Sequence, residues 1–394
     1  MARNRAALAV PAVAVSVTML AVAALIGWST IGDDRARKTS APGPDSSGTQ
    51  PAATSPPCDP LGVIASWPLE QRLAQLLMVG VDAQGGNEAE ALVTRYGVGG
   101  VFVGGQAASI FTDGSLTRLA TAGPVPPLVA VDEEGGRVQR IDQLAGPIPS
   151  ARAMAQTMTP AQVREIAAQR GRALRDAGVT MDLAPVVDVS NQSSGQVIGD
   201  RSFGDDPGVV SEYAGAFASG LRDAGVVPVL KHFPGHGHAS GDSHRQATVT
   251  PPVADLQASD LIPYRNLLDA LPIGVMTGHL DVPGLTAPDE PASVSGHAVR
   301  ELLRTGFGYD GFVITDDLSQ MVAIRRSYSV PEATLRALAA GSDMALLVTN
   351  AQVPELLGYL VDAVASHRLD ETAINRSVQR VLAVKAFDPC RRGV

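Results

Sequence analysis

Residues 207–232 read PGVVSEYAGAFASGLRDAGVVPVLKH, and this stretch shows the pattern on which the fold prediction depends. The part from Pro207 to Ala224 has a helical pattern of apolar residues. The short apolar run Val226–His232 follows it and has the length and composition of a buried strand. A helix that leads directly into a strand is half of a βαβ unit, so the stretch predicts a parallel sheet covered by helices.

The same alternation continues along the chain from about Leu61 onward. Strands are predicted at Leu76–Val81, Gly97–Val103, Pro127–Asp132, Thr180–Val187, Val226–His232, Ile273–His279, Gly311–Thr315 and Asp343–Val348. Helix-like stretches between them include Asn87–Arg95, Pro160–Ala177, Pro207–Ala224, Ala258–Ala270, His297–Arg304 and Pro331–Ala340. Eight such units in about 330 residues predict a single-domain α/β fold, a closed (β/α)₈ TIM-type barrel. An open doubly wound sheet is the alternative, but residues 81–86 (VDAQGG) lack the glycine spacing of a dinucleotide-binding loop.

The composition narrows the classes of partner. The chain has 394 residues and a formal net charge of −9, and this acidic balance argues against nucleic acid as a partner. Forty glycines and 28 prolines suit an α/β fold with many tight connections. Only 4% of the residues are aromatic, which favours a small deep pocket over a long groove with an aromatic platform.

The N-terminal residues predict export. Arg3 and Arg5 precede an uncharged apolar run whose centre, Val10–Trp28, is long enough to span a bilayer. We interpret this segment as an anchor that holds the protein on the outer face of the cytoplasmic membrane. Cleavage near Ala21-Val22-Ala23 would instead release a secreted protein. The predicted organisation is a signal peptide or anchor at residues 1–32, a disordered Pro/Ser/Gly-rich linker at 33–57 and the barrel domain at 58–394.

Two cysteines, Cys58 and Cys390, lie at opposite ends of the periodic part of the chain. Because the termini of a barrel usually meet in space, we expect a disulfide between them in an oxidising compartment. Two unrelated thiols are the alternative.

Polar side chains stand at the ends of six of the eight predicted strands. Barrel enzymes place their catalytic groups at the C-terminal ends of the strands, so these residues predict one polar pocket at that end. They are Asp132, Asp188, Lys231 with His232, His279, Asp316 and Asn350.

The densest polar feature is the loop at residues 231–244, KHFPGHGHASGDSH. Four of the seven histidines of the chain lie between His232 and His244. Three interpretations are open: the histidines bind a metal ion, Asp242 orients His244 for proton transfer, or the segment is an ordinary surface loop. A carboxylate two residues from an imidazole on an irregular loop can reach the ring and fix its tautomer, as in a His–Asp dyad.

Three shorter motifs contain further charged residues. In residues 311–319, GFVITDDLS, a buried strand ends in two carboxylates; a helix cap suits Asp317 better than Asp316, so Asp316 is the candidate nucleophile. Residues 131–140, VDEEGGRVQR, suit either a salt-linked turn or the binding of sugar hydroxyls, since carboxylates accept and arginines donate hydrogen bonds. Residues 199–204, GDRSFG, form a loop with a charged centre.

Together these motifs resemble glycoside hydrolase family 3, and within it the single-domain β-N-acetylhexosaminidase branch. The resemblance extends over most of the barrel domain and rests on residues 131–140, 198–203, 231–244 and 314–319, in the family's order and spacing. It implies a carbohydrate substrate and an enzyme that uses no metal or other cofactor. Gln320 is a departure, since the branch often continues from the serine directly to a methionine; the departure affects the geometry after Ser319 rather than Asp316.

The resemblance also implies roles for individual residues. Asp316 matches the nucleophile, His244 the acid/base and Asp242 its partner. The residues that match those holding the terminal N-acetylglucosamine are Asp132, Arg140, Arg201, Lys231 and His232. The implied reaction removes terminal non-reducing β-linked N-acetylglucosamine with retention, through a covalent glycosyl-enzyme on Asp316. The predicted export suggests peptidoglycan-derived fragments as the source of substrate.

The chemistry of such an enzyme agrees with the residue types. A retaining glycosidase needs a carboxylate that attacks the anomeric carbon and a second group that protonates the leaving oxygen. An imidazole has an unperturbed pKa of about 6.5, near working pH, whereas a glutamate in this role would need a pKa raised by burial. We also expect Lys231 and Arg201 to help keep Asp316 ionised.

Three alternative functions would each require different residues or properties. A β-glucosidase of the same family usually takes an acid/base glutamate from a second domain, whereas this chain has Asp242-Ser243-His244. A metal-dependent barrel hydrolase that uses the His232–His244 cluster predicts sensitivity to a chelator. A membrane-anchored cell-wall binding module would require a broken catalytic pair, but both Asp316 and His244 are present.

Overall fold

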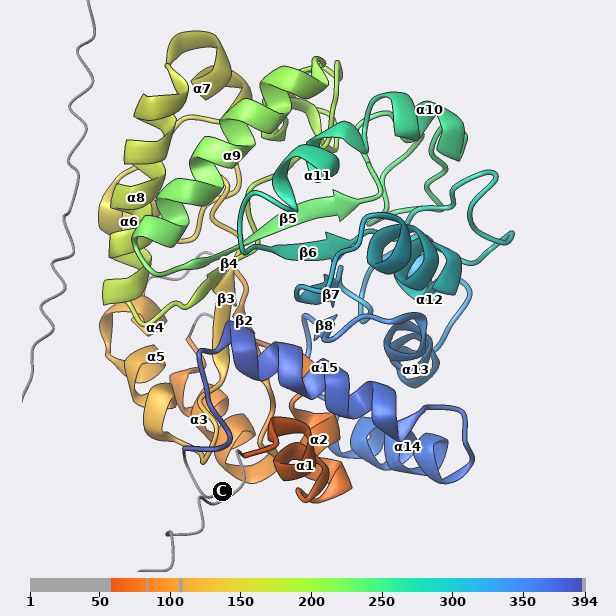
Figure 1. The fold of residues 1–394 in the computed structure, drawn as a ribbon. Helices are drawn as coiled ribbons and strands as arrows, with labels where there is room; N and C mark the ends of the chain where they lie inside the picture. Colours follow the sequence, from red (N-terminus) through yellow and green to blue (C-terminus); the bar gives the residue numbers. More distant parts are fainter. Residues whose placement is uncertain (1–57, 83, 106–108, 392–394) are drawn as a thin grey trace, which may run out of the picture. The chain divides into compact units, whose positions relative to one another are not determined.

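The computed structural model describes residues 58–82, 84–105 and 109–391, which form a barrel of eight parallel strands surrounded by helices (Figure 1). The strands are β1 (Leu77–Val81), β2 (Gly100–Val103), β3 (Leu128–Val131), β4 (Met181–Asp182), β5 (Val227–Phe233), β6 (Gly274–Thr277), β7 (Val313–Thr315) and β8 (Ala345–Leu347). The predicted (β/α)₈ barrel is confirmed, and all eight predicted strands are present in their predicted places.

The helices lie outside the barrel. They are α1 (Pro60–Ala65), α2 (Leu69–Ala74), α3 (Gly86–Tyr96), α4 (Ser109–Thr112), α5 (Ser115–Arg118), α6 (Asp142–Ala145), α7 (Ala151–Thr157), α8 (Pro160–Asp176), α9 (Pro207–Asp223), α10 (Val253–Ala258), α11 (Ile262–Leu267), α12 (Val322–Arg325), α13 (Val330–Ala340), α14 (Val353–Ala365) and α15 (Glu371–Val384). Three 3₁₀ helices, η1 (Leu119–Thr121), η2 (Gly199–Arg201) and η3 (Ala292–Val294), and the π-helix η4 (His297–Gly306) complete the elements of the described residues.

Hydrogen bonds between neighbouring strands close the sheet. The strand order is β7-β6-β5-β4-β3-β2-β1-β8, with each neighbouring pair parallel. A parallel bridge between Ile314 and Met344 joins β7 to the chain entering β8, and Thr315 N–H donates to Met344 O at 3.1 Å. All eight C-terminal strand ends therefore face one mouth of the barrel.

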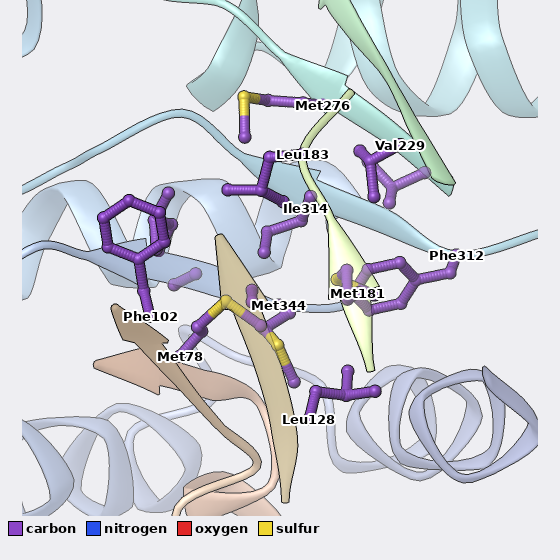
Figure 2. Packing of buried hydrophobic residues seen from close by; sticks show 14 of the residues in the cluster. Met78, Phe102, Leu128, Met181, Leu183, Val229, Met276, Phe312, Ile314 and Met344 are labelled. Atoms are coloured by element: carbon purple, nitrogen blue, oxygen red, sulfur yellow. The ribbon is translucent and has the colours of Figure 1, made fainter. Parts of the chain in front are cut away.

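Apolar side chains fill the interior of the barrel. Figure 2 labels ten of them, none more than 5% exposed: Met78, Phe102, Leu128, Met181, Leu183, Val229, Met276, Phe312, Ile314 and Met344. They come from all eight strands or from the residues next to them. Close-packed side chains of this kind make the interior a solid core rather than a channel, so the site must lie above it, at the mouth.

The two longest helices have sequence-encoded starts and a close contact. α8 begins with a capping box in which Thr159 and Gln162 satisfy each other's backbone N–H groups. α9 begins at Pro207, directly after Asp206, whose carboxylate caps the first turn; such a cap stabilises a helix by about 1 kcal/mol. A Cβ at Gly220 of α9 would lie 2.2 Å from the carbonyl oxygen of Arg164 in α8, so glycine is what allows these helices to approach.

Two elements are shorter in the structure than the sequence pattern predicted. β4 contains only Met181–Asp182 of the predicted Thr180–Val187, since Pro185 has no N–H to donate to a neighbouring strand. The helix expected at Ala258–Ala270 is shorter in the structure, where α11 covers only Ile262–Leu267; Pro263 lies in its first turn, where an N–H would have no helical partner in any case.

The two ends of the described barrel are joined covalently. Cys58 and Cys390 form the predicted disulfide, with Cα atoms 6.0 Å apart, and α1 packs beside α15 (Figure 1). The predicted signal anchor at residues 1–32 and the linker at 33–57 lie outside the described residues. Among residues 58–82, 84–105 and 109–391, no helix combines the length and the apolar character needed to cross a bilayer.

Candidate active site

A cavity of about 610 Å³ opens at the C-terminal ends of the strands. Apolar side chains from the ends of β2, β4, β6 and β8 form its base: Phe102, Leu183, Met276 and Leu346. Layers inside this type of barrel take side chains from alternate strands, so these four close the interior below the cavity. The polar residues that line it are Asp132, Glu134, Arg137, Arg140, Arg201, Lys231, His232, His244, Asp316, Asp317 and Gln320.

The odd-numbered strands supply charged residues to this cavity. Asp132 follows β3, Lys231 lies near the end of β5, and Asp316 follows β7. Each stands two residues after a buried apolar side chain of its own strand, and strand alternation directs residues i and i+2 to the same face. The row that includes Val229 and Ile314 in the core (Figure 2) therefore continues into charged groups at the mouth.

A buried carboxylate network forms one wall. Lys231 Nζ donates to Asp132 Oδ1 and to Glu134 Oε1, each at 2.6 Å. Arg201 makes a bidentate pair with Glu134, from Nε to Oε2 at 2.7 Å and from Nη2 to Oε1 at 2.8 Å. Burial alone would raise the pKa of Glu134, but the charges of Arg201 and Lys231 outweigh burial and hold that pKa well below its usual range. Burial would lower the pKa of Lys231, but Asp132 and Glu134 raise it, so Glu134 and Lys231 stay ionised at neutral pH.

Arg140 is held more loosely at the edge of this network. Its Nη2 lies 3.7 Å from Asp132 Oδ2, and its Nη1 donates to Gln139 O at 3.1 Å. The Nε–H is buried and has no hydrogen-bond partner in the described part of the chain. A buried unpaired donor costs about 1–3 kcal/mol, so a ligand with acceptor oxygens would be favoured beside Arg140.

Asp188 lies behind the cavity and orients His232. Its Oδ2 accepts a hydrogen bond from His232 Nδ1 at 2.7 Å, and its Oδ1 accepts from the backbone N–H groups of His232 at 3.2 Å and His236 at 2.7 Å. Because the Nδ1–H of His232 donates to this carboxylate, Nε2 is the ring nitrogen left for a ligand. His232 lines the cavity. Burial would raise the pKa of Asp188, but the two histidines outweigh burial and lower it.

The two consecutive carboxylates after β7, Asp316 and Asp317, accept different numbers of hydrogen bonds from the protein. Asp317 Oδ1 accepts from Ser319 N at 2.9 Å, from Ser319 Oγ at 2.6 Å and from Val348 N at 2.9 Å, and its Oδ2 accepts from Gln320 N at 2.9 Å. Asp316 Oδ1 accepts from the Asp317 backbone N–H at 2.9 Å. Asp317 therefore fixes the chain after β7, while Asp316 offers its carboxylate to the cavity.

Three imidazoles govern the charge of Asp316. Burial alone would raise its pKa, but His232, His279 and His244 outweigh burial and lower the pKa of Asp316 to about 2. His279 follows β6 and lies behind the cavity, where its Nε2 donates to the carbonyl oxygen of Asp317 at 2.8 Å. Asp316 is therefore ionised throughout the physiological range.

The expectation that Lys231 and Arg201 keep Asp316 ionised is corrected by this arrangement. Both cations are bound to Glu134, and Lys231 is also bound to Asp132, so their charge is matched by those carboxylates. The histidines are the groups that lower the pKa of Asp316. The sequence could not indicate this, because the pairing partners of Lys231 are far from it in the chain.

Asp242 and His244 form the predicted pair on the loop between β5 and α10. Asp242 Oδ1 accepts from His244 Nδ1 and from the His244 backbone N–H, both at 3.0 Å. The contact at Nδ1 leaves Nε2 as the free ring nitrogen, and His244 lines the same cavity as Asp316. The His244 side chain is 65% exposed, so it can exchange protons with solvent.

The four histidines of the loop do not converge on one point. Each has a different partner: Asp188 for His232, Ser243 for His236, Asp260 for His238 and Asp242 for His244. Within residues 58–82, 84–105 and 109–391, no group of three or more His, Cys, Asp or Glu side chains is arranged to hold a metal ion. The metal-cluster interpretation of the loop therefore has no ligand set in the described structure.

The six strand ends predicted to share one pocket divide into three groups. Asp132, Lys231 with His232, and Asp316 line the cavity. Asp188 and His279 are buried behind it, where each supports a cavity residue. Asn350 lines a neighbouring cavity instead, and its Nδ2 donates to Gly80 O at 2.9 Å. The prediction of a single pocket is thus correct for three of the six strand ends.

Glu134 is a cavity residue that was not predicted from the sequence motifs. The signal was available, since alternation past the end of β3 places Asp132 and Glu134 on one face and Glu133 on the other. Glu133 indeed points away, toward Arg170 on α8, with 3.4 Å between Oε1 and Nη1. Burial raises the pKa of Glu133, in contrast to the lowered pKa of Glu134.

Comparison with known proteins identifies the family. The family model for the glycosyl hydrolase family 3 N terminal domain matches residues 68–384. The chain belongs to glycosyl hydrolase family 3. This family 3 chain is 52% identical over 339 residues to the beta-hexosaminidase LpqI of Mycobacterium tuberculosis, a match that covers 84% of this chain and 86% of that protein.

Two solved structures of family 3 proteins are also similar. A family 3 glycosyl hydrolase from Mycobacterium smegmatis is 54% identical, with a TM-score of 0.79, over 83% of this chain and 98% of that chain. A family 3 β-N-acetylglucosaminidase from a Paenibacillus species is 32% identical, with a TM-score of 0.76, over 84% of this chain and 64% of that chain. The family predicted from the sequence motifs is confirmed.

Proposed function

We propose that this family 3 chain is a retaining β-N-acetylhexosaminidase that removes terminal non-reducing β-linked N-acetylglucosamine. The observation that carries the proposal is that Asp316 and His244 line one cavity beside a network of charged hydrogen-bonding groups, with Asp242 bonded to the His244 ring. The names of the similar proteins from Mycobacterium tuberculosis and the Paenibacillus species, a beta-hexosaminidase and a β-N-acetylglucosaminidase, support the same activity here.

The first chemical step forms a covalent glycosyl-enzyme. The ionised carboxylate of Asp316 attacks the anomeric carbon as the bond from that carbon to the leaving oxygen breaks. His244, protonated on both ring nitrogens, gives its Nε2 proton to the leaving oxygen. Asp242 stabilises the imidazolium through Nδ1. The lowered pKa of Asp316 supports its part, because only the ionised carboxylate is nucleophilic.

The second step regenerates the enzyme. His244, now neutral, takes a proton from water through Nε2, and the water oxygen attacks the anomeric carbon and displaces Asp316. Two displacements at one carbon give net retention. The exposure of His244 lets water or another acceptor reach it after the leaving group departs.

The charged wall of the cavity would hold the terminal sugar. Asp132 supplies acceptor oxygens for hydroxyl groups, while Arg140, Arg201 and Lys231 supply donors. The unpaired Nε–H of Arg140 and the free Nε2 of His232 are the two positions that gain a partner when a sugar binds.

We further propose that residues 1–32 direct the chain out of the cytoplasm and hold it on the outer face of the membrane, or release it if they are cleaved. A disulfide between Cys58 and Cys390 suits an oxidising compartment. Peptidoglycan-derived fragments with terminal N-acetylglucosamine are then the substrate within reach. Cell fractionation of the full-length protein tests the location, and recovery of the intact chain in the cytoplasmic fraction would contradict it.

Trapping of the covalent intermediate tests the mechanism. After incubation with a 5-fluoro N-acetylglucosaminyl fluoride, peptide mass spectrometry is expected to find the sugar on the peptide that contains Asp316. Asp316→Asn should abolish both labelling and turnover. The control is Asp310→Asn, which changes a carboxylate that precedes β7, at the end of the strand opposite to Asp316. This variant should keep both labelling and turnover. Wild-type labelling in Asp316→Asn would rule out the nucleophile assignment.

A panel of aryl glycosides tests the substrate and the acceptor. Turnover of the aryl β-N-acetylglucosaminide without turnover of the β-glucoside is expected, and the opposite preference would favour the β-glucosidase alternative. Each assay is run with and without phosphate, because a sugar phosphate product would identify phosphate rather than water as the acceptor. Activity that survives EDTA is also expected, whereas loss that added metal restores would favour the metal-dependent alternative.

A further inference from the structure

The loop that carries Asp242 and His244 is anchored at the residue between them. Ser243 is 2% exposed, although both of its neighbours are partly or largely exposed. Its Oγ is hydrogen-bonded to His236 Nε2 at 3.2 Å, and its carbonyl oxygen accepts from Ala323 N at 3.0 Å. The hydroxyl of Ser243 therefore points into the protein, while the side chains of its two neighbours are open to solvent and that of His244 also lines the cavity.

His236, the partner of Ser243, is itself tightly held. Its backbone N–H donates to Asp188 Oδ1 at 2.7 Å, and the residue is 2% exposed. A Cβ on Gly237 would lie 1.9 Å from the Val189 carbonyl oxygen, so only glycine allows the loop to pack this closely against the backbone at Val189. His236 is thus a fixed point of the loop.

The ring of His236 is set up to donate to Ser243. Burial, together with the nearby charge of His232, lowers the pKa of His236, so the ring is neutral and carries one N–H. Its Nδ1 is buried and lacks a hydrogen-bond partner in the described part of the chain. An N–H on Nδ1 would be a buried unpaired donor, so the proton belongs on Nε2, where it is donated to Ser243 Oγ.

We propose that His236 and Ser243 are positioning residues for proton transfer, because their buried hydrogen bond fixes the Asp242–His244 pair at the cavity. The inference rests on the acid/base role given to His244 above. Asp188 then sets two functional groups at once: one of its oxygens orients the His232 ring toward the sugar, and the other anchors the backbone of His236.

Loss of the hydrogen bond between His236 and Ser243 should slow only those reactions that need proton transfer from His244. Without the side-chain bond to Ser243, the local contact between Asp242 and His244 persists, but only backbone hydrogen bonds from Val322 and Ala323 then hold the pair, so its position relative to Asp316 is less well fixed. A positioned general acid contributes about 10²–10⁴-fold, and a misplacement of about 1 Å can cost 10²-fold. Leaving groups that depart without protonation would be unaffected.

The test uses Ser243→Ala and a series of aryl N-acetylglucosaminides whose leaving groups differ in acidity. For poor leaving groups we expect kcat/KM to fall roughly 10- to 100-fold. For a dinitrophenyl leaving group we expect less than about a 3-fold change, because no proton is needed. His244→Ala gives the reference slope. The matched control is Ser240→Ala in the same loop, an exposed serine whose hydroxyl donates to Val249 O at 3.1 Å; it should match wild type.

A second variant separates positioning from folding. In His236→Gln the side-chain amide can still reach Ser243 Oγ, so it should retain more activity on poor leaving groups than His236→Ala, at an equal melting temperature. A loss in Ser243→Ala that is equal for all leaving groups, or absent, would overturn the proposal while the slope of His244→Ala remains. If His244→Ala itself shows no dependence on leaving-group acidity, the acid/base assignment fails, and this inference fails with it.

Discussion

Glu134→Gln tests whether the buried carboxylate network holds the cavity in its binding shape. The change replaces a charged acceptor with a neutral amide of the same size, and three charge-assisted hydrogen bonds of 2.6–2.8 Å to Arg201 and Lys231 are weakened or lost. Removing one partner of a buried ion pair costs about 3–5 kcal/mol. We expect about 3 kcal/mol, the lower end of that range, because Lys231 keeps its contact with Asp132.

The pH dependence of this loss has a definite sign. The pKa of Glu134 is lowered in the folded state, so its contribution to stability is fully present above the unfolded-state pKa of about 4.3. That contribution disappears as the pH falls toward the folded-state pKa. The stability difference between wild type and Glu134→Gln should therefore be full at pH 7 and should shrink below about pH 4.

Two measurements check the Glu134 prediction. Thermal unfolding at pH 7 should show a melting temperature lowered by roughly 6 °C, at about 2 °C per kcal/mol for a chain of this size. KM for an aryl N-acetylglucosaminide should rise at least about 10-fold, since a loss of 1.4 kcal/mol in binding is already tenfold. Without the Glu134 carboxylate, Arg201 loses its bidentate partner, and Lys231 is held by Asp132 alone.

The control for Glu134→Gln is the same change one residue earlier. Glu133 is buried and faces α8, where its ion pair with Arg170 is longer than the Glu134 contacts, and burial raises its pKa, so its charge adds less to stability at pH 7. Arg170 also keeps its bonds to the carbonyl oxygens of Ile141 and Gly146 when Glu133 is changed. Its Oε2 accepts from the backbone N–H groups of Arg140 and Ile141, which a glutamine oxygen can also do. Glu133→Gln should melt within about 2 °C of wild type with an unchanged KM. Equal effects from the two variants would refute the assignment of the network to Glu134.

Three further predictions follow from the same structure. Replacing Cys58 and Cys390 by serine should lower the free energy of unfolding by up to about 5 kcal/mol, because the disulfide closes a loop spanning 332 residues of sequence separation; an unchanged denaturant midpoint would contradict this. Asp188→Asn should lower kcat/KM by at least about 10²-fold, since the His232 ring loses the carboxylate that orients it; wild-type kinetics would show that the orientation is unimportant. For an activated aryl substrate, kcat/KM should not fall between pH 7 and pH 4 on account of Asp316, whose pKa is about 2 and which therefore loses its charge only in much stronger acid; an acidic limb near pH 5 that Asp316→Glu shifts would contradict the lowered pKa.

The sequence predicted the scaffold well because its signals are local. Strand and helix patterns depend on spacings of two to four residues, which the chain displays directly, and the eight strands lie where those patterns place them. The Asp242–His244 contact was predictable for the same reason, since it joins residues two apart on one loop. The strand predicted at Thr180–Val187 overran β4, because Pro185 interrupts the local pattern, and the helix predicted at Ala258–Ala270 overran α11 at both ends.

The sequence by itself determined the family, the order of the strands and the residues that stand at their C-terminal ends. Only the tertiary structure decided which of those residues meet. Lys231 pairs with Asp132 across 99 residues, and Arg201 pairs with Glu134 across 67. Such contacts depend on barrel closure and on the register of each strand, which place distant residues within about 3 Å of each other. The burial and the pKa of each carboxylate depend on these contacts. Only the folded chain therefore distinguishes Asp316, whose carboxylate is available to a ligand, from the carboxylates that are bound to lysine, arginine or histidine side chains.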